Sequence, residues 1–112
     1  MSNKAVKKSG NKAQNKPLSK HAIKFLRGIA HDTKPVVTIA DKGLTENILI
    51  ELDICLNQHE LVKIKMRTDR ETRAAFSEAI LKQTGAQKVQ SIGQTLTIFR
   101  ANPKKPVFEL PK

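Results

Sequence analysis

The sequence predicts a single α/β domain in which three helices and four strands follow the order α-β-α-β-α-β-β. Helix-type and strand-type hydrophobic patterns alternate along the chain. Each predicted helix begins next to a residue that can cap it, and the last two strand patterns are separated only by a Gly-Gln pair. Because helices between strands return the chain to the same sheet, we expect one four-stranded mixed sheet that ends in an antiparallel hairpin.

The first predicted helix begins at Leu18-Ser19, where Ser19 can accept a hydrogen bond from a first-turn N–H. Its apolar residues recur at helical spacing as far as about His31, at Ile23, Leu26, Ile29 and Ala30. Another side of this helix carries basic side chains, at Lys20, Lys24, Arg27 and His31. This basic helix face is either a solvated surface or a binding surface for a polyanion, and its spacing alone does not decide between them.

A short β-branched run predicts a strand over Val36–Ile39, and Thr45 is placed to cap a second helix. That helix has apolar residues on one side, at Ile48, Leu49, Leu52, Cys55 and Leu56. The connecting turn, Ala40–Gly43, contains a lysine and a glycine. Since a helix start leaves backbone N–H groups without helical acceptors, we expect this turn to meet an anion, with Lys42 as the cation. The alternative is that Gly43 is only a turn residue.

The run Leu61–Arg67 alternates between apolar and basic residues, which predicts a half-buried strand. Its buried side is Val62, Ile64 and Met66, and its open, cationic side is Lys63, Lys65 and Arg67. Thr68 and Glu71 have capping-box spacing and predict the start of a third helix, which ends at Gly85. We expect this helix to bury Ala75, Phe76, Ala79 and Ile80.

Lys88–Ile92 and Thr95–Arg100 predict the two strands of a hairpin, with Leu96 and Ile98 pointing inward. On the outward side we expect Thr95, Thr97 and Phe99. The chain has no Trp or Tyr, so the aromatic platform on which some sheets stack bases is nearly absent. Contacts to a nucleic acid should therefore fall mainly on phosphates and 2′-hydroxyls.

The balance of charge favours an acidic partner. The chain has 112 residues, a formal net charge of +11 and a pI of about 10.1, which is typical of nucleic-acid binders. Residues 1–17 hold five lysines and no acid, and residues 101–112 hold three lysines and one glutamate, so these ends supply +7 of the charge. We expect a disordered basic tail over 1–17, a folded domain over 18–100 and a Pro/Lys-rich tail over 101–112. Both tails add salt-sensitive affinity or only improve solubility.

The residues offer little for catalysis. His21, His31 and His59 lie apart in the pattern and none has a carboxylate at a suggestive spacing. Cys55 falls on the apolar side of its helix, where a buried and inert thiol is expected. Asp41 and Glu46 are a weak ligand pair for Mg²⁺. We therefore expect no metal, no cofactor and no small-molecule substrate.

The cysteine count and the lack of a long apolar run indicate the cellular compartment. The single cysteine rules out an intrachain disulfide, and no apolar run approaches the roughly 18 residues of a membrane span. We expect a cytoplasmic monomer without a membrane partner.

Taken together, motifs spread over residues 18–100 resemble the stand-alone bacterial CRM-domain proteins of the YhbY type. The segments that carry the resemblance are Leu18-Ser19, Leu26–His31, Lys34–Val37, Gly43–Glu46, His59–Lys65, Glu71-Thr72, Thr84–Ala86, Ile92–Leu96 and Phe99-Arg100. The resemblance implies a fold similar to the C-terminal domain of translation initiation factor 3. It also implies binding to structured RNA and association with precursors of the large ribosomal subunit.

The family's RNA-contacting loop has the pattern Gly-x-x-Gly, which reads Ala40-Asp41-Lys42-Gly43 in this chain. Ala40 therefore stands at the first glycine, and Asp41 places an acid where a phosphate would approach. The expected RNA-binding residues combine the loop, the basic helix and the basic strand, namely Lys20, Lys24, Arg27, Lys34, Lys42, Gly43, Lys63, Lys65 and Arg67. The alternative function is a protein-interaction module in which the lysines serve solubility, and an enzyme is disfavoured.

Overall fold

The computed structural model describes residues 17–111, so residues 1–16 of the expected basic tail lie outside the described residues. The predicted order of elements is confirmed, and the observed bounds differ from the expected ones by a residue or two at some ends. The elements are α2 (Lys20–His31), β2 (Val37–Ile39), α3 (Glu46–His59), β3 (Leu61–Met66), α4 (Arg70–Thr84), β4 (Gln87–Ile92) and β5 (Thr95–Phe99).

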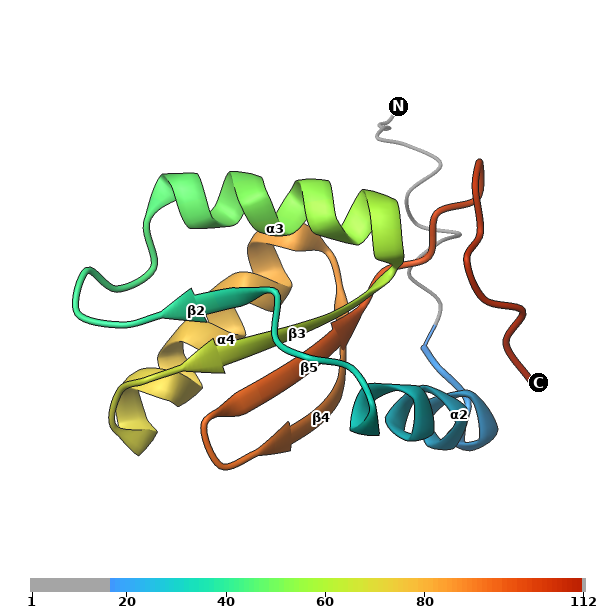
Figure 1. Cartoon of the computed structure of the whole chain (residues 1–112), viewed down its shortest axis with the longest axis horizontal. Coiled ribbons are helices and arrows are strands. Elements are labelled where there is room, and N and C mark those ends of the chain that lie inside the picture. Colours follow the sequence, from blue (N-terminus) through green and yellow to red (C-terminus); the bar gives the residue numbers. More distant parts are fainter. Residues whose placement is uncertain (1–16, 112) are drawn as a thin grey trace.

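The four strands form one mixed sheet in the order β2-β3-β5-β4, which confirms the predicted fold class (Figure 1). β2 pairs parallel with β3, whereas β5 pairs antiparallel with both β3 and β4. The short Gly93-Gln94 turn closes the β4–β5 hairpin as expected, with Gly93 at a positive φ of 55°. β2 therefore lies at one edge of the sheet and β4 at the other.

Helices pack on both faces of the sheet. α3 and α4 cover one face, where Leu52, Leu56 and Ile80 meet the apolar side of β3 and β5. α2 packs against part of the opposite face through Leu26 and Ala30. The strand residues under α2 are Leu61, Val89 and Phe99. The sheet thus has one fully covered face and one that is covered only at the end where α2 lies.

The position of α2 corrects the expectation for the outward side of β5. Phe99 does point away from Leu96 and Ile98, but it is buried because α2 lies over it. Thr97 on the same side is also buried. Phe99 is therefore part of a second small core and not an exposed ring.

The helix starts follow local capping, with one correction. Ser19 and Thr45 cap α2 and α3 as predicted, by accepting from the N–H groups of the third residue on. The cap of α4 is Asp69 and not Thr68, since the Asp69 carboxylate accepts from Thr72 N at 2.7 Å. Hydrogen bonds from the side chain and then from the backbone N–H of Thr72 hold the pKa of Asp69 below its ordinary value. Gly85 ends α4 in the left-handed conformation, with φ 72°, as expected.

The side of α4 that meets the sheet differs slightly from the predicted one. Ile80 is fully buried, Phe76 packs partly buried against the core, and Ala79 is partly buried. Ala75 is exposed, contrary to the prediction, because it lies on the solvent side of the helix.

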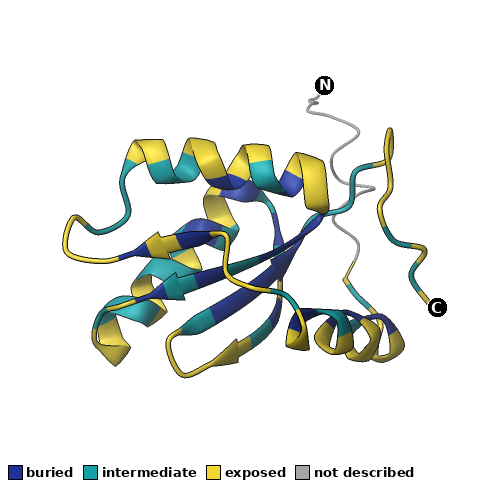
Figure 2. Ribbon diagram, in the orientation of Figure 1, coloured by how far each residue is buried: buried dark blue, intermediate teal, exposed yellow. Residues whose placement is uncertain are grey.

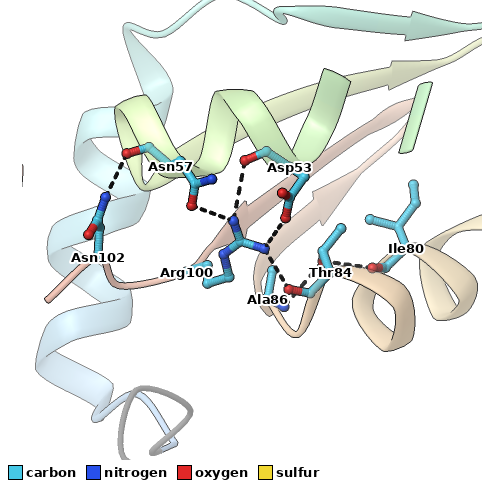
Figure 3. Close-up of polar contacts among 7 residues, drawn as sticks. All are labelled: Asp53, Asn57, Ile80, Thr84, Ala86, Arg100 and Asn102. Atoms are coloured by element: carbon cyan, nitrogen blue, oxygen red, sulfur yellow. Dashed lines mark hydrogen bonds and ion pairs between the residues drawn. The ribbon is translucent and has the colours of Figure 1, made fainter. Parts of the chain in front are cut away.

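Arg100 joins three elements at the end of β5 (Figure 3). Its guanidinium donates to the carboxylate and the carbonyl of Asp53 at 2.7 and 3.2 Å and to the Asn57 side chain at 2.8 Å. It also donates to the carbonyl of Thr84 at the end of α4, at 2.8 Å. Several parallel N–H donors are a property of arginine that lysine lacks. Arg100 thus fixes α3 and α4 to the sheet.

The segment that follows β5, residues 101–111, forms no helix or strand but lies against the body; we call it the C-terminal strap. Phe108 and Leu110 pack on the α2 cluster, and the Phe108 ring meets the Phe25 ring edge-on. The buried carboxylate of Glu60 accepts from the backbone N–H groups of the strap at 2.5–3.1 Å, from Asn102, Val107 and Phe108. The segment expected to be a Pro/Lys-rich tail therefore has no regular secondary structure over residues 101–111 and packs closely on the domain.

Candidate functional site

The basic face of α2 lies in solvent, because the opposite side of the helix is used for packing. Leu26 and Ala30 are buried against the sheet, whereas Lys20, Lys24 and Arg27 are exposed. Arg27 also donates from Nε to the carbonyl of Val89 at 3.2 Å. This contact orients the guanidinium along β4 and leaves its other N–H groups available.

Lys63 has a structural partner that the alternation of β3 does not reveal. Its ammonium donates to the carbonyls of Ala30 and Thr33 at 2.9 and 3.0 Å, at the end of α2. Ala30 lies in the last turn of α2 and Thr33 just beyond it, and a cation at a helix C-terminus interacts favourably with the helix dipole. One of the three ammonium N–H groups remains for a ligand. Lys34, the residue after Thr33, is exposed and extends the basic surface from the same helix end.

The basic residues of β3 connect α2 with the Ala40–Gly43 turn. Lys63 and Lys65 alternate with buried residues of β3, and Arg67 continues this alternation directly after the strand ends at Met66, so the three share the sheet face on which α2 lies. Lys65 stands opposite Thr38 in the β2 register. Arg67 N donates to the carbonyl of Ile39 at 2.7 Å, directly before the turn. The three residues form a row that we call the β3 row, from the end of α2 to the turn.

The Ala40–Gly43 turn closes on itself, which corrects part of the expected anion site. Gly43 N donates to the carbonyl of Ala40 at 2.8 Å, so this N–H is not offered to an anion. The N–H of Ile48 is likewise not offered to an anion, because it donates to the Thr45 hydroxyl. At the start of α3 this leaves the N–H groups of Glu46 and Asn47, which have no acceptor within the helix.

The missing first glycine of the loop pattern has a conformational explanation. Gly43 has a φ of 72°, a conformation that favours glycine. Between residues 17 and 111, Glu60 is the only non-glycine residue with a positive φ, so Ala40 is not in this region. The turn therefore requires its second glycine and not its first. Asp41 and Lys42 are both exposed, and the acid lies beside the cation that was expected to bind phosphate.

A groove runs beside α2 on the partly open sheet face. It has a volume of about 210 Å³ and brings together the expected residues Arg27 and Lys63. The other residues that line it are His31, Gln90, Ile92, Thr95 and Thr97. The groove is cationic on the helix side and carries hydroxyl and amide groups on the strand side, a combination suited to phosphate and sugar.

A second hollow, of about 510 Å³, lies between α4 and the β4–β5 turn, and the sequence analysis did not anticipate it. It contains Arg70 and Arg73 from the first turns of α4, with Ser77, Ser91 and Gly93 nearby. Arg73 also donates to the carbonyl of Thr68 at 2.5 Å. Cations are unfavourable near a helix N-terminus, so two arginines in the first turns of α4 were the sequence feature that could have drawn attention to this hollow.

Figure 1 shows how these parts are arranged: α2 lies at one end of the sheet and the Ala40–Gly43 turn at the other. The structure gathers Lys20, Lys24, Arg27, Lys34 and Lys63 at the α2 end, and Lys42, Gly43 and Arg67 at the turn. Lys65 lies between the two groups in the β3 row. The expected residues therefore do not form one pocket but an extended surface.

The remaining chemistry of the described region is sparse. Over residues 17–111 no three His, Cys, Asp or Glu side chains gather as metal ligands, and no helix is long and apolar enough to cross a membrane. Cys55 is half-buried and packs beside the core, and burial, together with the nearby Glu51, raises the pKa of its thiol. The thiol is therefore mostly protonated at neutral pH.

Comparisons with known proteins identify the family of this chain. The sequence model of the CRS1 / YhbY (CRM) domain matches residues 18–100. An RNA-binding protein of Haemophilus influenzae is 41% identical over 96 residues, which cover 85% of this chain and 96% of that protein. A probable RNA-binding protein of Pseudomonas aeruginosa is 40% identical over 88 residues, which cover 78% of this chain and 85% of that protein.

A solved structure also matches the fold. The solution structure of a hypothetical protein from Staphylococcus aureus aligns with a TM-score of 0.72 and 27% sequence identity. The alignment covers 85% of this chain and all of that one. The mixed α/β architecture is thus shared over the whole of a solved protein.

Proposed function

Since the chain belongs to the CRS1 / YhbY (CRM) domain family, we propose that it is a non-catalytic RNA-binding protein that acts in assembly of the large ribosomal subunit. Its ligand in this proposal is structured rRNA. The basic face of α2, the β3 row and the Ala40–Gly43 turn contact it together. The protein acts as a monomer in the cytoplasm and needs no cofactor.

The observation that supports this proposal best is the β3 row. A row of cations along one strand, with α2 at one end and a turn with an exposed lysine at the other, matches the extended phosphate backbone better than a compact ligand. The strand aromatic, Phe99, is buried, so contacts by stacking on the sheet are not available. Recognition therefore rests on RNA shape and 2′-hydroxyl groups.

The test is the salt dependence of binding to large-subunit rRNA, measured by fluorescence anisotropy at several KCl concentrations. The binding constant falls as salt is added, so the slope of log K against log salt is negative. Lys24→Ala and Lys42→Ala should each reduce the magnitude of this slope by about one, because each removes one phosphate contact. Lys82→Ala is the matched control, since Lys82 is exposed on α4, which covers the other sheet face. Slopes unchanged in the first two variants would exclude those lysines from the interface.

The assembly role has a separate test, sedimentation of a cell lysate through a sucrose gradient. At low salt the protein should migrate with the large subunit or its precursors and should leave those fractions when the salt is raised. A position only at the top of the gradient would overturn the ribosomal role. Binding to subunits that survives nuclease and high salt would favour the alternative, a protein-interaction module.

A further inference from the structure

The outer side of α3 exposes two large apolar side chains where a solvated helix would carry polar ones. Ile50 and Ile54 are 52% and 51% exposed, and their i, i+4 spacing places them next to each other on one side of the helix. The opposite side of α3 is already occupied, since Leu52 and Leu56 are fully buried against the sheet. Figure 2 shows the outer side of α3 as exposed along its length.

The fold does not need these two isoleucines. They lie outside both apolar clusters of the described chain, so they contribute little to packing. Isoleucine is also a poorer helix former than alanine, leucine or a charged residue with a straight side chain. An isolated apolar residue at the surface is common, whereas an exposed pair at the centre of a helix face indicates a binding surface.

The surroundings of the pair have the opposite charge to the rest of the protein. α3 contains no Lys or Arg, whereas α2 and α4 contain three each. Three of the ten acids of the chain lie on the exposed part of α3, at Glu46, Glu51 and Asp53. Asp53 pairs with Arg100, yet its side chain remains 56% exposed. This surface repels phosphate, so it does not extend the RNA interface.

We propose that the outer face of α3, Ile50 and Ile54 with the acids around them, binds a Lys/Arg-rich segment of another protein that places an apolar side chain on the isoleucine pair. Charge complementarity identifies the class of partner, because three exposed carboxylates on a helix without Lys or Arg, of which Asp53 pairs with Arg100, favour a basic segment. Basic arms are common in proteins that bind nucleic acid, so other proteins bound to the same RNA would supply such a segment, a step that rests on the proposed function. A second copy is disfavoured, because a two-fold interface would place these acids against one another.

The placement of α3 allows both partners to bind together. α3 covers one face of the sheet, whereas α2 and the β3 row lie on the other. The protein then joins an RNA and a basic protein segment through opposite faces. This inference is independent of which RNA is bound, and its test separates the two interfaces.

The probe is a fluorescein-labelled synthetic peptide of alternating lysine and leucine, and a lysine–serine peptide of the same length and charge is the control ligand. The full chain should bind the lysine–leucine peptide more tightly. Ile50→Ala combined with Ile54→Ala should weaken that binding by about tenfold or more, as expected for an apolar anchor. Ile92→Ala is the matched variant, because Ile92 is 63% exposed but lies in the α2 groove, and it should leave peptide binding unchanged.

Charge is tested by Glu51→Lys, which should weaken peptide binding about fivefold at low salt and less at high salt. RNA binding by the double isoleucine variant should equal that of the unchanged chain, which also shows that the variant is folded. Equal binding of both peptides, or no loss in the double variant, would overturn the proposal. A fall in RNA affinity would assign the face to RNA instead.

Two other occupants would also overturn it. If the chain binds the peptide only after residues 1–16 are removed, the face holds the chain's own basic end. If concentration-dependent dimers form in analytical ultracentrifugation and the double isoleucine variant abolishes them, the face is occupied by a second copy.

Discussion

At the scale of single residues, the same side chain can serve the fold and the ligand. Lys63 donates to the carbonyl of Ala30 in α2 and to that of Thr33 just beyond the helix, and Arg27 donates to the carbonyl of Val89, yet both line the α2 groove. A charge pattern cannot distinguish these uses, because the partners lie 30 or more residues away in sequence. Their role in RNA binding therefore stays a prediction, now with a defined geometry.

Two glycines provide a matched pair of substitutions. Gly43→Ala should destabilise the protein by about 1–2 kcal/mol, because residue 43 has a positive φ and its new Cβ would lie 3.4 Å from the Phe76 ring. Gly28→Ala should stabilise it by about 0.5–1 kcal/mol, since Gly28 lies within α2 and no other atom lies within 4 Å of its new Cβ. Urea unfolding measures both, and equal midpoints for the two variants would contradict this account of the turn.

At the scale of elements, the C-terminal strap, which the family match does not include, ties together parts of the matched domain. The match ends at residue 100, and the strap begins directly after it. Glu60, at the junction of α3 and β3, holds the strap through backbone N–H groups, while Phe108 packs beside α2. The strap therefore couples the position of α2, and hence its basic face, to the sheet.

Glu60→Gln should cost about 1–3 kcal/mol of stability, because the amide N–H₂ group would face a strap N–H where a carboxylate oxygen now accepts. Ending the chain after Asn102 should cost a similar amount, since it exposes apolar surface on the α2 cluster. Glu109→Gln is the control, because Glu109 is exposed on the same strap. Urea unfolding with RNA anisotropy is the measurement. Unchanged midpoints in both altered chains would show that the strap is dispensable.

At the scale of the whole molecule, charge is distributed unevenly. The two ends supply most of the +11, the face with α2 and the β3 row carries the expected RNA contacts, and α3 carries no cation. With such a distribution, the charged ends attract RNA over a long range. The basic face of the folded body then sets the orientation in which the RNA binds. The same distribution makes the outer side of α3 unfavourable for RNA.

A chain that begins at Pro17 lacks the five lysines at positions 4, 7, 8, 12 and 16. Its RNA affinity should fall, and the slope of log K against log salt should become smaller in magnitude by about 2–4, because fewer counterions are released on binding. The preference for structured over unstructured RNA should not change, since the body makes that choice. Anisotropy with both RNAs at several salt concentrations measures this, and an unchanged slope would show that these lysines do not contact RNA.

Local patterns predicted most of the elements and only part of the site. The caps Ser19 and Thr45 and the stop at Gly85 were correct, because each depends on a few neighbouring residues. The start of α4 was misplaced by one residue, since Thr68 and Asp69 are both able to cap and the carboxylate prevails. The hollow with Arg70 and Arg73 was missed, because hairpin and helix meet there only in the fold. The likeness to translation initiation factor 3 stays a prediction.

The sequence by itself determined the order of helices and strands, the mixed sheet and the excess of positive charge, because these follow from periodicity, capping and composition. Only the tertiary structure decided which end of the sheet α2 covers, and with it the burial of Phe99 and the partners of Lys63. It also decided that Glu60 binds the strap and that Ile50 and Ile54 remain exposed. These features depend on contacts between residues far apart in the chain, which no local pattern encodes.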